Sequence, residues 1–451
     1  MQPDMKRIGY ILLMVCIALP SLASTRADSV RTKRPVYKLA YRLSGMAGTI
    51  MKDQKVDSWL GRPVAGAQFA VEFLSTGRWH CLQQWNNASI GVGASFFNLG
   101  NDKMLGNAFT AYGYMNQPFY NGTHFRIGLR PTIGLAAVTK RYINTLPEGY
   151  TPYSSGDGGF KHANQSIGSI LNGYLAMELF MDFPIKDGWE ITVNGGWHHI
   201  SNGSVMHPNG GYNMFMGALG VRYQPNVQSN EVQSTKEKPK RMTTKELHEE
   251  VDKPWAVEIS ATGGMKQNYY ADNRNGQRFY GAATVKAAAY WVPVSIFRLG
   301  GGIDAFYDGY YYAVSSEFAA ANPGSPVTYF GKTYLKESSI ANCFRVGLSI
   351  QPEFIIGNLT AGIHVGFYLY DPIKNLEPYA EAKKADETGE SLHRGIFYSY
   401  DFTKASNYQD GWCYMQFVLK YHVLEHLFVQ VGLKTHGVRA EFVDAGLGVA
   451  F

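Results

Sequence analysis

The sequence is poor in charged residues. Asp, Glu, Lys and Arg make up only 17% of its 451 residues, whereas ordinary soluble domains carry about 25%. An apolar content of 45% and an aromatic content of 14% exclude a disordered chain. The formal net charge of +6 is spread along the sequence. We therefore expect no nucleic acid as a partner.

A long apolar run is also missing from the chain after its N-terminus. No stretch approaches the roughly 18 consecutive apolar residues of a membrane-spanning helix, so a helical membrane protein is excluded. The apolar run at residues 8–19 follows Lys6 and Arg7 and precedes small residues around Ala23. This order predicts a signal peptide over residues 1–23, cleaved near Ala23, and an exported chain.

Cysteine is scarce. The exported chain retains an odd number of widely spaced cysteines, Cys81, Cys343 and Cys413. It contains no CxxC motif and no Cys/His cluster at the spacing of metal ligands. The sequence therefore predicts neither a disulfide framework nor a metal site.

Glycine, in contrast, is abundant, with 49 residues, and apolar positions alternate with polar or small ones. In residues 125–135 every odd position is apolar, while the even positions carry Arg, Gly or Thr. Odd positions are also apolar in residues 415–421 and 427–433. Alternation at every second residue is typical of β-strands with one apolar and one polar face.

These alternating runs last about ten residues, longer than the five or six of an ordinary strand. Glycine and arginine on the polar face favour strands that face lipid on one side and a lumen on the other. The last strand, residues 443–451, has an apolar face that ends at Phe451, which resembles the C-terminal signal of bacterial outer-membrane barrels. We interpret Tyr310, Tyr311 and Tyr312 as part of an aromatic girdle at the membrane interface. The predicted fold is an all-β, antiparallel outer-membrane β-barrel.

The predicted strands fall into two halves. We expect about eight strands in residues 35–225 and about eight in residues 255–451, which form either two eight-stranded barrels or one larger barrel. The linker between them, residues 226–254, is rich in Lys and Glu, and an even number of preceding strands places it on the periplasmic side. Thr243 and Glu246 have the capping-box spacing of a short helix.

One predicted hairpin places polar residues on the apolar face. His199 and Ser201 share parity with Trp197, so all three face lipid. The Cα atoms of residues two apart on a strand lie about 6.5–7 Å apart. Asn213 shares parity with the apolar residues of the returning strand and is expected beside His199. Polar groups exposed to hydrocarbon are unfavourable by a few kcal/mol unless they are paired, so this group needs an explanation.

Nucleophilic catalysis is one explanation. A serine needs an imidazole to take its proton, and the imidazole needs a third group to fix its tautomer. We expect Ser201 to be the nucleophile, His199 the general base and Asn213 the orienting group. The residues alone leave open a second interpretation, an aromatic-belt histidine with a serine and an asparagine at the edge of a loop.

A family resemblance favours catalysis. Residues 199–203 read His-Ile-Ser-Asn-Gly, and Pro208, Asn209, Gly211 and Asn213 follow. This segment resembles the active site of the lipid A 3-O-deacylase and acyloxyacyl hydrolase family of outer-membrane barrels. Such enzymes remove an ester-linked acyl chain from lipid A. The resemblance covers about half of the chain, residues 37–223, and we recognise no catalytic motif beyond residue 255, so the role of the second half stays open.

The chain departs from the family at Asn213, where the family has a glutamate. An amide oxygen can hold the imidazole tautomer but stabilises the imidazolium less than a carboxylate does, so we expect weaker activity. The outer-membrane phospholipase A family has a similar segment with asparagine at this offset. The resemblance further implies that the backbone N–H groups of Asn202 and Gly203 stabilise the oxyanion.

The leading hypothesis is therefore a serine esterase of the bacterial outer membrane that acts on lipid A or a related glycolipid. The alternatives are a phospholipase A and a non-catalytic pore or binding barrel. We expect no cofactor, with calcium only under the phospholipase alternative, and the sequence leaves the oligomeric state open. His198 faces the lumen by parity, His207 lies in the loop, and His436 is interpreted as structural with Glu441.

Overall fold

The computed structural model describes residues 38–51, 61–75, 79–150, 163–225, 241–267, 278–321, 327–329, 333–335, 339–371, 413–437 and 439–451. The predicted signal peptide lies outside these residues. In the described part of the chain, no helix is long and apolar enough to cross a membrane.

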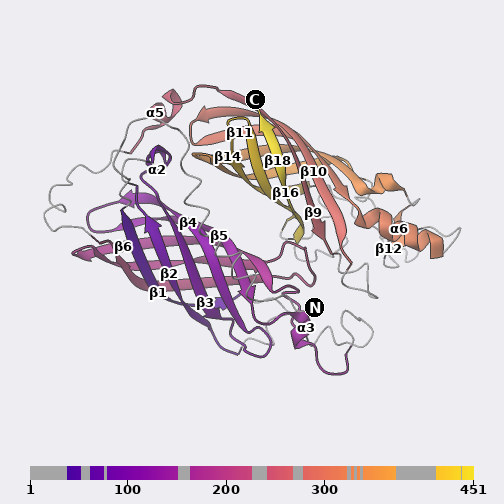
Figure 1. Ribbon diagram of the computed structural model, residues 1–451, viewed down its shortest axis with the longest axis horizontal. Helices are drawn as coiled ribbons and strands as arrows, with labels where there is room; N and C mark the ends of the chain where they lie inside the picture. Colours follow the sequence, from indigo (N-terminus) through magenta and orange to yellow (C-terminus); the bar gives the residue numbers. More distant parts are fainter. Residues whose placement is uncertain are drawn as a thin grey trace, which may run out of the picture. The chain divides into compact units, whose positions relative to one another are not determined.

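The first barrel is a closed sheet of eight strands that pair in chain order, drawn in indigo to magenta in Figure 1. Its strands are β1 (Leu39–Ile50), β2 (Val64–Phe73), β3 (Ser89–Asn98), β4 (Asn107–Asn121), β5 (Arg126–Val138), β6 (Leu171–Lys186), β7 (Trp189–Ser201) and β8 (Tyr212–Tyr223). The barrel closes where β1 pairs antiparallel with β8. Two short helices, α2 (His80–Gln84) and α3 (Tyr142–Thr145), lie in its connections.

The second barrel is also closed and has eight strands. They are β9 (Trp255–Lys266), β10 (Tyr280–Val294), β11 (Phe297–Asp308), β14 (Phe344–Ile356), β15 (Leu359–Tyr370), β16 (Cys413–His422), β17 (Leu427–His436) and β18 (Arg439–Ala450). The connection from β11 to β14 contains α6 (Tyr310–Ala321), β12 (Val327–Tyr329), β13 (Thr333–Leu335) and η3 (Ile340–Cys343). Of the two arrangements that the sequence left open, two eight-stranded barrels is therefore correct.

The short helix α5 (Thr244–Glu249) precedes the second barrel and has the predicted capping box. The backbone N–H of Glu246 donates to Thr243 Oγ1 at 3.3 Å, and the N–H of Thr243 donates to Glu246 Oε2 at 2.7 Å. These two bonds satisfy donors that a helix N-terminus otherwise leaves unpaired.

Alternation along the strands gives both barrels an apolar outer face. On β8, Phe215 and Leu219 are 54% and 64% exposed, whereas the intervening Met216 is buried. On β18, Leu447 is exposed and Phe428 of the neighbouring β17 is buried. An apolar exterior around a polar interior is the pattern expected of strands in lipid. The predicted lipid face is confirmed.

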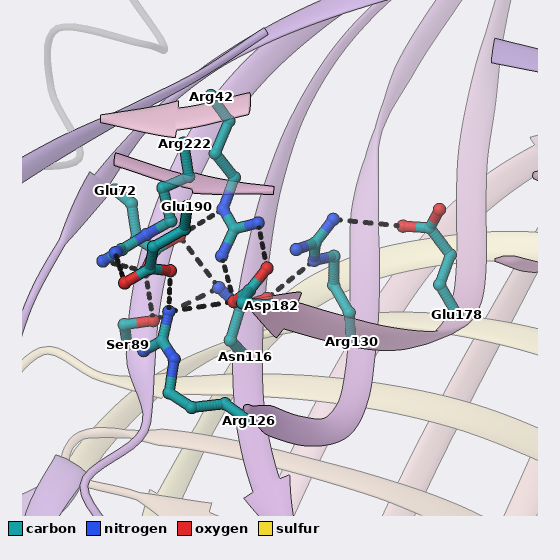
Figure 2. Close-up of polar contacts among 10 residues, drawn as sticks. All are labelled: Arg42, Glu72, Ser89, Asn116, Arg126, Arg130, Glu178, Asp182, Glu190 and Arg222. Carbon is teal, nitrogen blue, oxygen red and sulfur yellow. Dashed lines mark hydrogen bonds and ion pairs between the residues drawn. The ribbon is translucent and has the colours of Figure 1, made fainter. Parts of the chain in front are cut away.

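The interior of the first barrel is ionic at the end where β1 begins. The cluster drawn in Figure 2 centres on three arginines and three carboxylates: Arg42, Arg126, Arg222, Glu72, Asp182 and Glu190. Nε of Arg42 donates to Glu72 at 2.6 Å, and both of its terminal nitrogens donate to Asp182 at 2.8 Å. Because an eight-stranded barrel is only wide enough for side chains, these charges are neutralised by one another.

The second barrel repeats this solution with other residues. Most of its buried charges form two groups, one toward the start of β9 and one toward its end: Glu258, Arg298, Glu353 and Lys420, then Lys266, Asp308, Arg345, Lys434 and Glu441. Lys286 and Asp304 form a further buried ion pair, with 3.6 Å between Nζ and Oδ1. Positive and negative side chains therefore fill the lumen together. The sequence predicted arginines on the polar face, but it did not predict their acidic partners.

The girdle prediction for Tyr310 and Tyr311 is wrong. Both residues begin α6 and are buried, at 2% and 8% exposure, while Tyr312 is 44% exposed. Successive residues of a helix point about 100° apart, so strand parity does not apply to them. The ring of Tyr311 lies 5.9 Å from Lys266 Nζ and 5.7 Å from Arg345 Cζ. Cation–π attraction to these interior charges accounts for its burial.

Replacing Arg42 by methionine should destabilise the first barrel, because Glu72 and Asp182 would lose a buried cation. We expect the free energy of unfolding to fall by about 3–5 kcal/mol, as measured by urea unfolding in lipid vesicles with tryptophan fluorescence. The matched control is Arg62→Met, because the Arg62–Asp102 ion pair is 54% and 62% exposed and should contribute less than about 1 kcal/mol. Equal losses in the two variants would contradict this account.

Candidate active site

The β7–β8 hairpin has the register that the sequence predicts. His199 pairs with Asn213, and Trp197 pairs with Phe215. His198 is 1% exposed inside the barrel, so the alternation of the strand places its neighbour His199 on the outer face. Ser201 is the last residue of β7, two positions further along that face.

The side chains of His199 and Asn213 form a hydrogen bond on this face, with 2.8 Å between Nδ1 and Oδ1. An amide oxygen only accepts, so Nδ1 of the imidazole carries the proton and donates it. Nε2 is then the basic nitrogen of the neutral ring. A histidine that takes a proton from a serine hydroxyl needs this tautomer.

Trp197 also contacts this histidine, and the sequence did not predict it as part of the site. Its ring stacks on the imidazole of His199, with 5.4 Å between the centroids and 16° between the planes. The sequence signal was the shared parity of Trp197 and His199, which we interpreted only as exposure to lipid.

The loop that follows β7 is fixed by Asn202, which is buried. Nδ2 of Asn202 donates to Ser169 Oγ and to the carbonyl of Met206, both at 2.7 Å. Oδ1 of the same side chain accepts from the backbone N–H of Met206 at 3.2 Å. One asparagine therefore ties the loop to itself and to the residues before β6.

The structure distinguishes Asn202 from Gly203, the two residues whose backbone N–H groups the resemblance implies as oxyanion donors. The N–H of Asn202 donates to Asn209 Oδ1 at 3.0 Å, so this donor is engaged within the loop. Gly203 has a φ of +63°, in the left-handed region that glycine adopts at little cost. The donor role of Gly203 stays a prediction. Asn209 belongs to the segment that carries the family resemblance, but the sequence did not predict its contact with Asn202.

Of the other histidines that the sequence singles out, His207 lies in the loop between β7 and β8, as predicted, and His198 and His436 lie inside the barrels. His198 faces the lumen as predicted, with Nδ1 2.7 Å from the hydroxyl of Tyr174. In the second barrel, Nε2 of His436 lies 2.8 Å from the hydroxyl of Tyr368, and Nδ1 lies 3.4 Å from Glu441. These buried contacts agree with the structural interpretation of His436.

Metal sites and disulfides depend on how the His, Cys, Asp and Glu side chains of the described residues are arranged. Among them, no three His, Cys, Asp or Glu side chains could hold a metal ion together. Cys81, Cys343 and Cys413 form no disulfide.

Two family models match the chain, one on each barrel. The lipid A 3-O-deacylase (PagL) model matches residues 65–222. The model of the acyloxyacyl hydrolase C-terminal domain matches residues 255–381 and 395–451. Together they cover most of the two barrels. No curated protein matches the sequence.

Three solved structures resemble the chain. The outer membrane enzyme PagL is 14% identical over 40% of this chain and 98% of its own, with a TM-score of 0.26. Neisserial surface protein A is 10% identical over 41% of this chain and 96% of its own, with a TM-score of 0.24. The siderophore receptor PirA from Acinetobacter baumannii is 6% identical over 94% of this chain and 69% of its own, with a TM-score of 0.22.

Replacing Asn213 by leucine should let the neutral His199 ring adopt its other tautomer, because the ring would lose the acceptor for its Nδ1 proton. Histidine ¹⁵N NMR of the protein in micelles, at a pH where imidazole is neutral, should find a protonated Nδ1 in the wild type and a shift toward the Nε2 tautomer in Asn213→Leu. The neighbouring variant Phe215→Leu should behave like the wild type. A protonated Nδ1 that persists in Asn213→Leu would contradict this assignment.

Proposed function

The chain belongs to the lipid A 3-O-deacylase family of bacterial outer-membrane ester hydrolases, and from this premise we propose that it is a serine esterase. Its proposed reaction removes an ester-linked acyl chain from lipid A or a related glycolipid of the outer leaflet. The observation that supports the serine mechanism is the 2.8 Å hydrogen bond from His199 Nδ1 to Asn213 Oδ1 on the outer face of β7 and β8. With the proton on Nδ1, Nε2 is the unprotonated nitrogen of the neutral His199 ring, which lies on the face that also holds Ser201.

The proposed mechanism has two halves. Oγ of Ser201 attacks the ester carbonyl while Nε2 of His199 takes the hydroxyl proton, and the tetrahedral intermediate then expels the sugar hydroxyl, which receives that proton. A water molecule, activated by the same nitrogen, hydrolyses the acyl-serine and releases the fatty acid. Asn213 holds the ring in the required tautomer throughout. The N–H of Gly203 is the proposed donor to the oxyanion.

The position of the hairpin fits a substrate of the outer leaflet. Outer-membrane barrels have short periplasmic turns and longer extracellular loops. The turn from β6 to β7 spans only residues 187–188, whereas residues 139–170 connect β5 to β6 at the opposite end. Ser201 lies at the end with the long loops, which this rule makes extracellular. An outward-facing site there meets lipid A within the membrane, without extraction of the substrate.

Ser201→Ala and His199→Ala should each lower the release of fatty acid at least about 1000-fold, because each removes a partner of the same proton transfer. The measurement is mass spectrometry of lipid A after incubation with purified protein in micelles. His124→Ala alters a histidine in the β4–β5 turn and should retain full activity.

Undiminished release by Ser201→Ala would refute the serine mechanism. A wild-type protein that leaves lipid A intact would refute the substrate. Calcium-dependent release from phospholipid in that case would instead support the phospholipase alternative.

Asn213→Glu should raise kcat at least about tenfold, because a carboxylate stabilises the imidazolium that forms in the transition state and an amide does not. The control is Asn213→Gln, because glutamine has the length of glutamate without its charge, and this variant should show no increase in kcat. Steady-state kinetics on lipid A measure both variants. A glutamate variant no faster than the wild type would show that imidazolium stabilisation does not limit this enzyme.

A further inference from the structure

The imidazole of His199 is contacted from two directions. Asn213 binds it at one edge through Nδ1, and Trp197 covers one of its faces, with 16° between the two ring planes. Near-parallel aromatic rings with centroids 4.5–7 Å apart attract each other in an offset stack. Trp197 also pairs across the hairpin with Phe215, which is exposed.

The two contacts restrain different motions. The hydrogen bond to Asn213 fixes one point of the ring and leaves the tilt about that point to other contacts. A stacked neighbour fixes the plane of the ring. Because Nε2 is separated from Nδ1 by Cε1, a tilt about the Asn213 bond moves Nε2 while Nδ1 stays in place. A displacement of about 1 Å at a reacting group can lower a rate by about 100-fold.

We propose that Trp197 is a positioning residue, which holds the plane of the His199 ring so that Nε2 stays directed at the hydroxyl of Ser201. This inference rests on the proposed serine-esterase function. It differs from the ordinary role of a lipid-facing tryptophan, which anchors a strand at the membrane interface. Trp189 offers the comparison, because it lies on the same face of the same strand and is 45% exposed. Its ring packs on Tyr223, with 4.6 Å between the ring centroids.

Three variants separate positioning from anchoring. Trp197→Phe keeps a flat ring, Trp197→Leu keeps an apolar surface without a ring, and Trp189→Leu removes the other lipid-facing tryptophan of β7. Trp197→Met is a second ringless variant in case the leucine variant is unstable. Heat-modifiable migration on SDS gels shows which variants are folded barrels.

Two readouts are needed. The first is the rate at which a fluorophosphonate probe labels Ser201, which requires an activated serine but no lipid A. The second is kcat and KM for lipid A. We expect the ringless variants to label about tenfold more slowly and to lose about tenfold in kcat with KM little changed. Trp197→Phe should recover most of both rates, and Trp189→Leu should match the wild type.

Wild-type labelling rates in the ringless variants would overturn the inference. An increase in KM at constant kcat would also overturn it, because Trp197 would then contact the substrate rather than orient the base. Failure of the proposed function looks different: the wild-type protein itself would neither react with the probe at Ser201 nor release fatty acid.

Discussion

Closure of eight strands into a barrel is the constraint from which the other features of this protein follow. Every second side chain must enter a lumen that has room for side chains and little else, and the others must face lipid. A charge in the lumen is tolerated only with a partner. Arg42 therefore binds Glu72 from β2 and Asp182 from β6. The ion pairs hold distant strands together, and the side chains of these three residues are at most 4% exposed.

The same constraint gives two adjacent histidines different environments. His198 enters the lumen, where Tyr174 satisfies its Nδ1. His199 points outward, where Asn213 satisfies its Nδ1. Only the outward ring can meet an ester that diffuses in the membrane. Parity on β7, rather than residue type, therefore decides which histidine can serve as a base for a lipid substrate.

Under the proposed serine mechanism, an amide at position 213 balances the cost of a charge facing lipid against the stabilisation of the imidazolium. A carboxylate beside His199 would stabilise the imidazolium more strongly, but a lone charge on a lipid-facing strand is costly to the apo protein. The amide gives up charge stabilisation and keeps the directional bond to Nδ1. The stack of Trp197 on the ring is compatible with this arrangement, because it restrains the imidazole without adding a polar group to the lipid face.

Local patterns in the sequence were sufficient for the parity of His199 and for its pairing with Asn213, because alternation assigns both residues to the outer face and consecutive strands of a barrel are neighbours. Closure was not predictable in the same way. Whether β8 returns to β1 depends on pairs such as Tyr41 with Tyr223, and strands that resemble one another do not specify which edge they meet.

The lumen and loop contacts that sequence reasoning missed are non-periodic or long-range. Arg42 and Asp182 are 140 positions apart, so no local pattern links them. Oδ1 of Asn209 accepts a hydrogen bond from the backbone N–H of Asn202 within a loop, where the alternation of strands does not apply.

In the second barrel, the same constraint buries a histidine among charged side chains. Its His364 lies in the lumen with Nδ1 2.9 Å from Lys286 Nζ and Nε2 2.8 Å from Glu353. Lysine has only protons to donate, so Nδ1 accepts and the proton of the neutral ring is on Nε2, directed at the carboxylate. Both nitrogens of this imidazole are occupied by charged neighbours, and the ring is fully buried. A histidine held in this way links Lys286 to Glu353 across the lumen, and an acyl ester in the leaflet cannot reach it. Similar strands thus place histidine in a structural role when it faces inward and in a chemically accessible role when it faces outward.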